Sequence, residues 1–166
     1  MRPRTLLFLL AIVPFATGLA KDENGMRVEV SKSTISRDDE RRRDGYLDKV
    51  DRTLGLKIQA KNISMKPLEP GEIEWTIIVE RWGYSPARFE RYKGKQIIEA
   101  LKPGESVNLT VGQSPVGGYE GYSKQYQDKM EAWQVVIRHG GKETITVTSG
   151  STFEKANQRA KDAEPR

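Results

Sequence analysis

The stretch that decides the fold class is LGLKIQAK, residues 54–61, in which apolar and polar side chains alternate without a break. Successive side chains of a β-strand point to opposite faces of a sheet, so this alternation is typical of a strand with one buried face. Ile63 falls out of phase, which predicts that the strand ends near Asn62. The next residues, 64–71, are rich in proline and glycine and are expected to form a loop.

Alternation of the same kind continues on both sides of this stretch. Residues 72–80 place Ile73, Trp75, Ile77 and Val79 on one face, as expected of a central strand whose tryptophan fills a small core. By the same criterion, further strands are predicted at 26–30 with an extension toward Ile35, at 88–101, at 106–111, at 133–138 and at 143–148.

Two of these segments carry additional local signals. Residues 88–101 are expected to form one or two edge strands bent at Gly94. The last two strands are expected to form a tight hairpin around residues 139–142, where glycine supplies a positive φ. About seven strands with turn signals between them, and no convincing amphipathic helix, predict an all-β fold, an immunoglobulin-like antiparallel β-sandwich.

Three segments lack this alternation. Residues 37–52 form a highly charged insert, which is expected to be a solvated loop or a short exposed helix. Residues 112–128 are expected to form a long polar loop. The tail, residues 151–166, permits a short helix, but its polar residues predict a frayed end.

The N-terminus has the pattern of a secretory signal peptide. Arg2 and Arg4 precede the apolar run 6–15, and the small residues of 18–20 are followed by a polar segment. The apolar run is too short to cross a bilayer of about 30 Å as a helix. We therefore expect cleavage after Ala20, a sandwich domain over residues 21–150 with no membrane span, and export to the periplasm, the outer surface or the medium.

Composition excludes several classes of function. The formal net charge is +5, with 28 basic and 23 acidic residues. Basic and acidic residues are interleaved almost everywhere, whereas nucleic-acid binding depends on clustered Lys and Arg, so we expect no nucleic-acid partner. The chain contains no cysteine, which removes disulfides, thiolate metal sites and a cysteine nucleophile. We expect no cofactor.

The order of strands and turns resembles bacterial immunoglobulin-like domains of the cell-adhesion-related, CARDB-like type. The residues that carry this resemblance are AKNIS at 60–64, the strand at 73–79, the turn LKPGES at 101–106 and the final hairpin. It covers roughly residues 53–149 and implies an exported sandwich domain with an adhesive role. The chain looks more loosely like small immunoglobulin-like proteins encoded beside type IV pilus components.

Candidate catalytic and metal-binding residues have simpler structural interpretations. His139 lies at a hairpin tip without companion ligands, and Ser114 precedes a proline where an oxyanion hole needs a backbone donor. Glu72 and Glu74 could flank a glycosidic bond. Both also occupy the polar positions of the alternating strand 72–80, where a solvent-facing side chain is expected without any catalytic role. The acidic residues of 38–44 lack calcium-loop spacing and are interleaved with arginines, so we expect no metal site.

Aromatic side chains supply the strongest indication of function. Tyrosine offers a broad, rigid and amphipathic surface for recognition of proteins or sugars. The candidate binding residues are Tyr119, Tyr122 and Tyr126 in the polar loop, with a second patch of Trp82, Tyr84 and Tyr92. For the loop tyrosines, binding and structural roles both remain open. Trp82 and Phe89 are expected to cover the ends of the core.

Together these observations predict a non-catalytic binding or adhesion module that recognises a protein or glycan through aromatic loops. The alternative is a structural or assembly component of an envelope or pilus-type machine, in which an exposed strand edge pairs with a partner strand. A carbohydrate-active enzyme is the third interpretation. The expected partner is an envelope or surface protein, or a glycan; the sequence specifies neither the ligand nor the oligomeric state.

Overall fold

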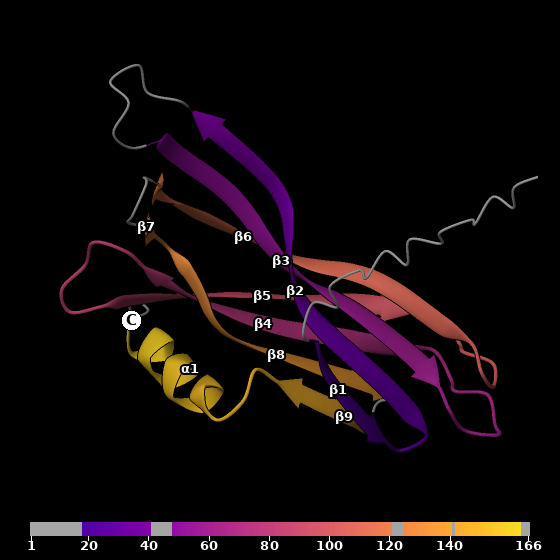
Figure 1. Cartoon of the computed structure of the whole chain (residues 1–166). Helices are drawn as coiled ribbons and strands as arrows, with labels where there is room; N and C mark the ends of the chain where they lie inside the picture. Colours follow the sequence, from indigo (N-terminus) through magenta and orange to yellow (C-terminus); the bar gives the residue numbers. More distant parts are fainter. Residues whose placement is uncertain (1–17, 41–47, 121–124, 141, 164–166) are drawn as a thin grey trace, which may run out of the picture.

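The computed structural model describes residues 18–40, 48–120, 125–140 and 142–163, which form two antiparallel β-sheets and one helix (Figure 1). The first sheet contains five strands in the order β1-β2-β3-β6-β7 and the second contains four in the order β5-β4-β8-β9. The strands are β1 (Leu19–Glu23), β2 (Met26–Glu40), β3 (Asp48–Asn62), β4 (Gly71–Arg81), β5 (Arg88–Ile98), β6 (Ser106–Glu120), β7 (Gln125–Gln127), β8 (Lys129–His139) and β9 (Lys142–Thr148), and the helix is α1 (Thr152–Asp162).

This arrangement confirms the predicted all-β fold with two antiparallel sheets. The described residues form nine strands, however, where the sequence predicts about seven. The two additional strands are β1 and β7, which are short and lie at opposite borders of the first sheet. The predicted final hairpin is also present, because His139 pairs with Lys142 and Gly140 has a φ of +56°.

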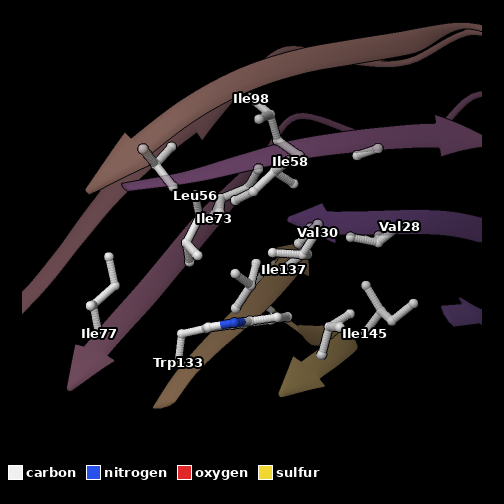
Figure 2. Close-up of a cluster of buried hydrophobic side chains, with 14 of the residues drawn as sticks. Val28, Val30, Leu56, Ile58, Ile73, Ile77, Ile98, Trp133, Ile137 and Ile145 are labelled. Atoms are coloured by element: carbon white, nitrogen blue, oxygen red, sulfur yellow. The ribbon is translucent and has the colours of Figure 1, made fainter. Parts of the chain in front are cut away.

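The hydrophobic core lies between the two sheets (Figure 2). Both sheets contribute aliphatic side chains at alternate positions, as the sequence pattern predicts. Buried residues with at most 3% exposure include Val28, Val30, Leu56, Ile58, Ile73, Ile77, Ile98, Trp133, Ile137 and Ile145. Trp133 is the central aromatic residue of this core, whereas Trp75, which the sequence places there, is only partly buried and packs against it.

The predicted end of β3 at Asn62 is confirmed and has a clear physical cause. Asn62 is fully buried, and its amide group replaces the hydrogen bonds that a continuing strand would make. Its Nδ2 donates to the carbonyl oxygens of Lys66 (2.8 Å) and Leu101 (2.9 Å), and its Oδ1 accepts from the backbone N–H of Ser64 (2.9 Å). The loop after β3 is therefore attached to the core by one buried side chain.

A row of β-bulges bends the first sheet near its middle. Pairing shifts register at Ile35 in β2, and between β3 and β6 it shifts opposite Gly55. Gly112 lies at the bulge in β6 with a φ of +77°, and a Cβ there would come within 2.5 Å of Cδ1 of Ile77. A left-handed glycine at this position is typical of a bulge that increases strand twist.

Beyond the bulges, the first sheet continues as an arm. We define the arm as residues 36–40, 48–53, 113–120 and β7. Figure 1 shows the ends of β2 and β3 rising away from the second sheet. The arm corrects two expectations: the described part of the charged insert 37–52 is strand, and so is most of the segment 112–128 that the sequence assigns to a loop.

Pairing between strands explains why such polar segments form a sheet. Arg37 forms ion pairs with Asp39 (2.7 Å) and with Glu120 of β6 (3.0 Å), and Arg52 also pairs with Glu120. Val50 and Val116 are buried beside these charges, with 3% and 7% exposure. Opposite charges on neighbouring strands stabilise the arm where its apolar content is low.

The C-terminal tail is not a frayed polar end over its described residues. α1 packs on the outer face of the second sheet, opposite the core (Figure 1). Its buried side chains are Phe153, Ala156 and Ala160, which form a second apolar cluster with Ile78, Phe89 and Ala132. The tail up to Asp162 therefore contributes to the packed domain.

Gly94 does not divide β5, which is one continuous strand without a shift of register against β4. Gly94 pairs directly with Trp75 of β4, and the indole ring of Trp75 lies over the glycine. The absence of a side chain at position 94 gives the indole its space.

Replacing Gly94 with alanine is expected to lower the free energy of unfolding by about 1–3 kcal/mol. The added Cβ would overlap Cζ2 of Trp75 and lie 2.7 Å from its Cε2, and the ring is backed by the core. Urea unfolding measures the change. Ile97→Ala, on the same strand at a position that is 76% exposed, is the control and should be neutral. Equal stability of Gly94→Ala and the unsubstituted chain would contradict the assigned contact.

The expected cleavage site lies in β1, where Ala20 pairs with Glu29 and Lys21 pairs with Val28. Most of the predicted leader, residues 1–17, lies outside the described residues. Within the described ranges, no helix has the length and apolar character that crossing a bilayer requires.

Candidate binding surface

Three aromatic residues from distant parts of the sequence meet where the arm leaves the sandwich. Trp82 follows the last residue of β4, and its ring centroid lies 5.2 Å from that of Tyr126 and 6.4 Å from that of Tyr119. The rings are tilted by 53° and 74°, and both geometries are favourable for aromatic pairs. Tyr119 of β6 and Tyr126 of β7 are directly paired across the strands. We call Trp82, Tyr119 and Tyr126 the aromatic cluster.

The backbone of Trp82 is held by a carboxylate. Its N–H donates to Oδ1 of Asp128 (2.9 Å), while Oδ2 of Asp128 accepts from Nη1 of Arg81 (2.6 Å) and from the backbone N–H of Gly117 (3.1 Å). Arg81 also donates to the carbonyl oxygen of Pro115 (2.9 Å). These bonds join the end of β4 to β6, so the cluster lies on a fixed junction between the two sheets.

Arg81 continues this network toward β5. Its Nη2 donates to Oε2 of Glu90 (2.5 Å) and to the hydroxyl oxygen of Tyr92, and that hydroxyl donates to Glu90 (3.0 Å). The side chains of Arg81 and Asp128 are only 16% and 14% exposed. Because both side chains are largely enclosed, the two charges depend on each other for solvation.

The ionisation of these groups follows from their contacts. Burial lowers the pKa of Arg81, but hydrogen bonds to Glu90 and Asp128 outweigh burial and raise that pKa overall. The hydrogen bond from Arg81 is the main reason that the pKa of Glu90 is below its ordinary value. Burial, followed by the bond to Glu90, raises the pKa of Tyr92. Arg81 and Glu90 therefore both remain ionised at neutral pH.

The structure brings together only some of the predicted binding residues. Trp82 joins Tyr119 and Tyr126, although the sequence assigns them to separate patches. Tyr84 is 56% exposed, and the guanidinium carbon of Arg88 lies 5.5 Å from its ring centroid. Tyr92 packs against the core and bonds to Arg81, which gives it a structural role. Tyr122 lies outside the described residues.

The expectation that Trp82 covers an end of the core is wrong, because this side chain is 47% exposed. The related expectation for Phe89 is correct as to burial, with 7% exposure, but Phe89 lies under α1 on the outer face of the second sheet. Trp82 instead packs on Tyr119 and Tyr126 of the arm, which lie in the segment predicted from sequence to be a long polar loop.

A hollow of about 400 Å³ adjoins the aromatic cluster. Trp82 and Tyr84 supply its aromatic wall, and Glu80, Gln127 and Lys129 contribute polar groups. Gln127 donates to Glu120 (2.6 Å) and accepts from Arg52 (3.2 Å). The hydrogen bond from Gln127 is the main reason that the pKa of Glu120 is lowered.

The residues that sequence reasoning missed are Arg81, Asp128 and Glu120. Asp128 lies 46 positions from Trp82, and Glu120 lies 68 positions from Arg52. No local pattern marks such residues before the strands are paired. The available signals are that Arg81 directly follows a predicted strand and that both Arg81 and Asp128 lie close to an aromatic residue in the sequence.

Three of the other candidate residues, Glu72, Glu74 and His139, have structural partners. Glu72 forms an ion pair with Lys95 (3.1 Å), and Glu74 forms one with Arg138. His139 places Nδ1 against the carbonyl oxygen of Glu69. Ser114 is fully buried in β6 and is not positioned to meet a substrate. In the parts of the chain that the structure describes, no three Asp, Glu or His side chains are placed to share a metal ion.

The fold and the aromatic cluster define the class of this chain: an all-β sandwich protein with a supported aromatic surface. No model of a known protein family matches the sequence, and no curated protein sequence matches it. A crystal structure from Akkermansia muciniphila is similar over 82% of this chain and 78% of its own, with a TM-score of 0.36 and 16% sequence identity. The class therefore rests on the sheets and contacts of this chain itself.

Proposed function

We propose that this protein is an exported, non-catalytic binding module that recognises a partner at the cell envelope or surface through the aromatic cluster. The single observation that carries the proposal is the environment of Trp82. Its ring is 47% exposed, yet its backbone is bonded to Asp128 and its ring packs on Tyr119 and Tyr126. A large aromatic ring that is both exposed and held in place is typical of a binding hot spot, because little entropy is lost on association.

Export and the immunoglobulin-like identity belong to the same proposal. The basic and apolar pattern of residues 2–20 supports a leader, and the sandwich supports the resemblance to CARDB-like domains. The ion pairs of Glu72 and Glu74 give these carboxylates a structural explanation, which favours binding over glycoside hydrolysis. The proposed location is the periplasm, the outer surface or the medium.

Trp82→Ala is expected to abolish partner capture while lowering the free energy of unfolding by only about 1–2 kcal/mol, because the ring is 47% exposed and packs on the two tyrosines of the arm. The full chain with a C-terminal tag is expressed in its native host, crosslinked and purified. Ile97→Ala, which removes an exposed apolar side chain at the opposite end of β5, is the matched control and should retain capture. Equal capture by both variants would refute the proposed surface.

A second candidate is assembly by strand addition at β5. This strand lies at the border of the second sheet and presents one backbone edge that pairs with no described strand. Lys93 and Lys95 on this edge oppose pairing between two copies, so a partner strand with acidic residues fits it better. Lys93→Pro removes a backbone donor on this strand; loss of capture in this variant, with capture retained in Trp82→Ala, would favour assembly over recognition by the cluster.

A further inference from the structure

We propose that the hollow beside Trp82 binds a neutral oligosaccharide, and this inference rests on the proposed function of the aromatic cluster. The hollow of about 400 Å³ falls within the usual size range of small-ligand sites, roughly 300–1,000 Å³. Trp82 and Tyr84 line it and are 47% and 56% exposed, so aromatic surface is available to a ligand.

The ring surfaces fit the apolar face of a sugar. A pyranose ring presents axial C–H groups on one face and hydroxyl groups around its edge. Aromatic rings pack against the C–H face, while polar side chains at the rim fix the orientation of the ligand. Trp82 is suited to the first role because its backbone is bonded to Asp128, which is itself enclosed by Arg81 and Gly117.

The polar rim matches hydroxyl groups. Glu80 accepts hydrogen bonds and Lys129 donates them. The amide of Gln127 already donates to Glu120 and accepts from Arg52, but its second N–H and the second lone pair of its oxygen remain for a ligand. Each sugar hydroxyl is both a donor and an acceptor, so the several hydroxyls of one sugar can pair with all three side chains. A proline-rich peptide, the other ligand that aromatic grooves commonly bind, lacks N–H donors at its prolines and would offer Glu80 fewer donors than a sugar does.

The charge of the hollow favours a neutral saccharide. Arg81, although it lines the hollow, is already bonded to Asp128 and Glu90. Lys129 forms an ion pair with Glu131 (2.6 Å) and faces Glu80 across the β4–β8 pairing. Acidic and basic groups thus offset each other, and an anionic saccharide would gain little from the site.

Tryptophan fluorescence tests this inference directly. Trp133 is 3% exposed and Trp75 is partly buried, so a ligand in the hollow should change mainly the emission of Trp82. The full chain is titrated with short β-1,4-linked oligomers of glucose, N-acetylglucosamine and mannose. We expect a saturable change with at least one oligomer that is nearly independent of salt. Trp82→Ala should weaken binding, measured by calorimetry, about tenfold or more, and Glu80→Gln should weaken it about threefold.

Two further variants keep the result interpretable. Trp82→Phe retains an aromatic platform and should bind more tightly than Trp82→Ala, and Ile97→Ala should bind as the unsubstituted chain does. Thermal melts of all variants show whether lost binding reflects unfolding. Binding that is equal in Trp82→Ala and the unsubstituted chain would overturn the assigned site.

The remaining outcomes separate this inference from the proposed function. If no oligomer binds but envelope capture still depends on Trp82, the saccharide inference fails and the binding module stands. Binding of proline-rich peptides or of acidic polysaccharides alone has the same consequence. If neither oligomers nor envelope partners depend on Trp82, both proposals fail. Release of reducing ends from a bound oligomer would support the saccharide site and overturn the non-catalytic function.

Discussion

Arg81→Met is expected to lower the free energy of unfolding by about 3–5 kcal/mol, the range found when one partner of an enclosed ion pair is removed. Arg81 binds Asp128, Glu90, Tyr92 and the carbonyl oxygen of Pro115 at once. Methionine fills similar space but leaves these groups without their shared donor. Asp128 is the most affected, because its side chain is only 14% exposed. Equilibrium unfolding in urea measures the loss.

The matched control is Arg27→Met. Arg27 also forms a bidentate ion pair, with Asp22 at 2.7 Å and 2.8 Å, but both side chains are nearly half exposed. Solvent already screens that pair, so the control should unfold as the unsubstituted chain does. Comparable losses in the two variants would show that the enclosure of Arg81 has no energetic consequence.

The same network predicts a pH dependence. The pKa of Glu90 in the folded chain lies below its ordinary value of 4.5, chiefly because Arg81 donates to it. The ionised form is therefore favoured by folding, and this contribution is fully present above pH 4.5. Stability should fall as the pH drops from 4.5 through the folded-state pKa of Glu90, and Arg81→Met should show a shallower fall. Parallel slopes in urea unfolding between pH 3 and 6 would contradict the assigned coupling.

Phe153→Ala is expected to lower the free energy of unfolding by about 3–5 kcal/mol, the usual range for removing a buried aromatic ring. Phe153 is 2% exposed and lies in the cluster that joins α1 to the second sheet. Its loss exposes Ile78 and Phe89 on the outer face of that sheet. Urea unfolding gives the energy, and hydrogen exchange reports whether α1 remains formed.

Lys155→Ala is the control on the same helix, because Lys155 is exposed and alanine is a strong helix former. This variant should be neutral or slightly stabilising. If Phe153→Ala were equally neutral, the tail would be a peripheral segment, as its polar composition suggests. If exchange increased only in α1 without a change in global stability, the helix would fold independently of the sandwich.

The sandwich was predictable because the alternation of apolar and polar residues along a strand shows directly which side chains are buried. Alternation over 54–61 and 73–79 has the period of a strand, and both segments lie in the centres of the two sheets. The arm was not predictable in this way, because its polar strands are stabilised by partners far away in sequence. Arg37 and Glu120, for example, are 83 positions apart.

The helix illustrates a weaker signal that was present in the sequence. Phe153, Ala156 and Ala160 follow the spacing of one helical face, and all three are buried. The charged residues between them suggest fraying only if the helix is considered alone. Packing against the second sheet supplies the stabilisation that a helix of 11 residues lacks in isolation.

The candidate site was predictable by residue type but not by grouping. Tryptophan and tyrosine residues in polar, glycine-containing segments are recognisable in sequence as binding candidates. Trp82 contacts Tyr119 and Tyr126, whereas Tyr92 belongs to the Arg81 network. This grouping depends on the pairing of β6 with β7 and on the bulges that direct the arm. These features follow from tertiary contacts and have no local signature.

Photocrosslinking from the aromatic cluster in living cells tests the proposed binding surface most directly. A photoreactive phenylalanine replaces Tyr126, which lies beside Trp82, and in a second strain it replaces Ile97, which is exposed at the opposite end of β5. We expect a specific crosslinked partner from position 126 and none from position 97. Crosslinks from position 97 alone, or identical products from both positions, would contradict the claim that the aromatic cluster is the surface through which this protein binds.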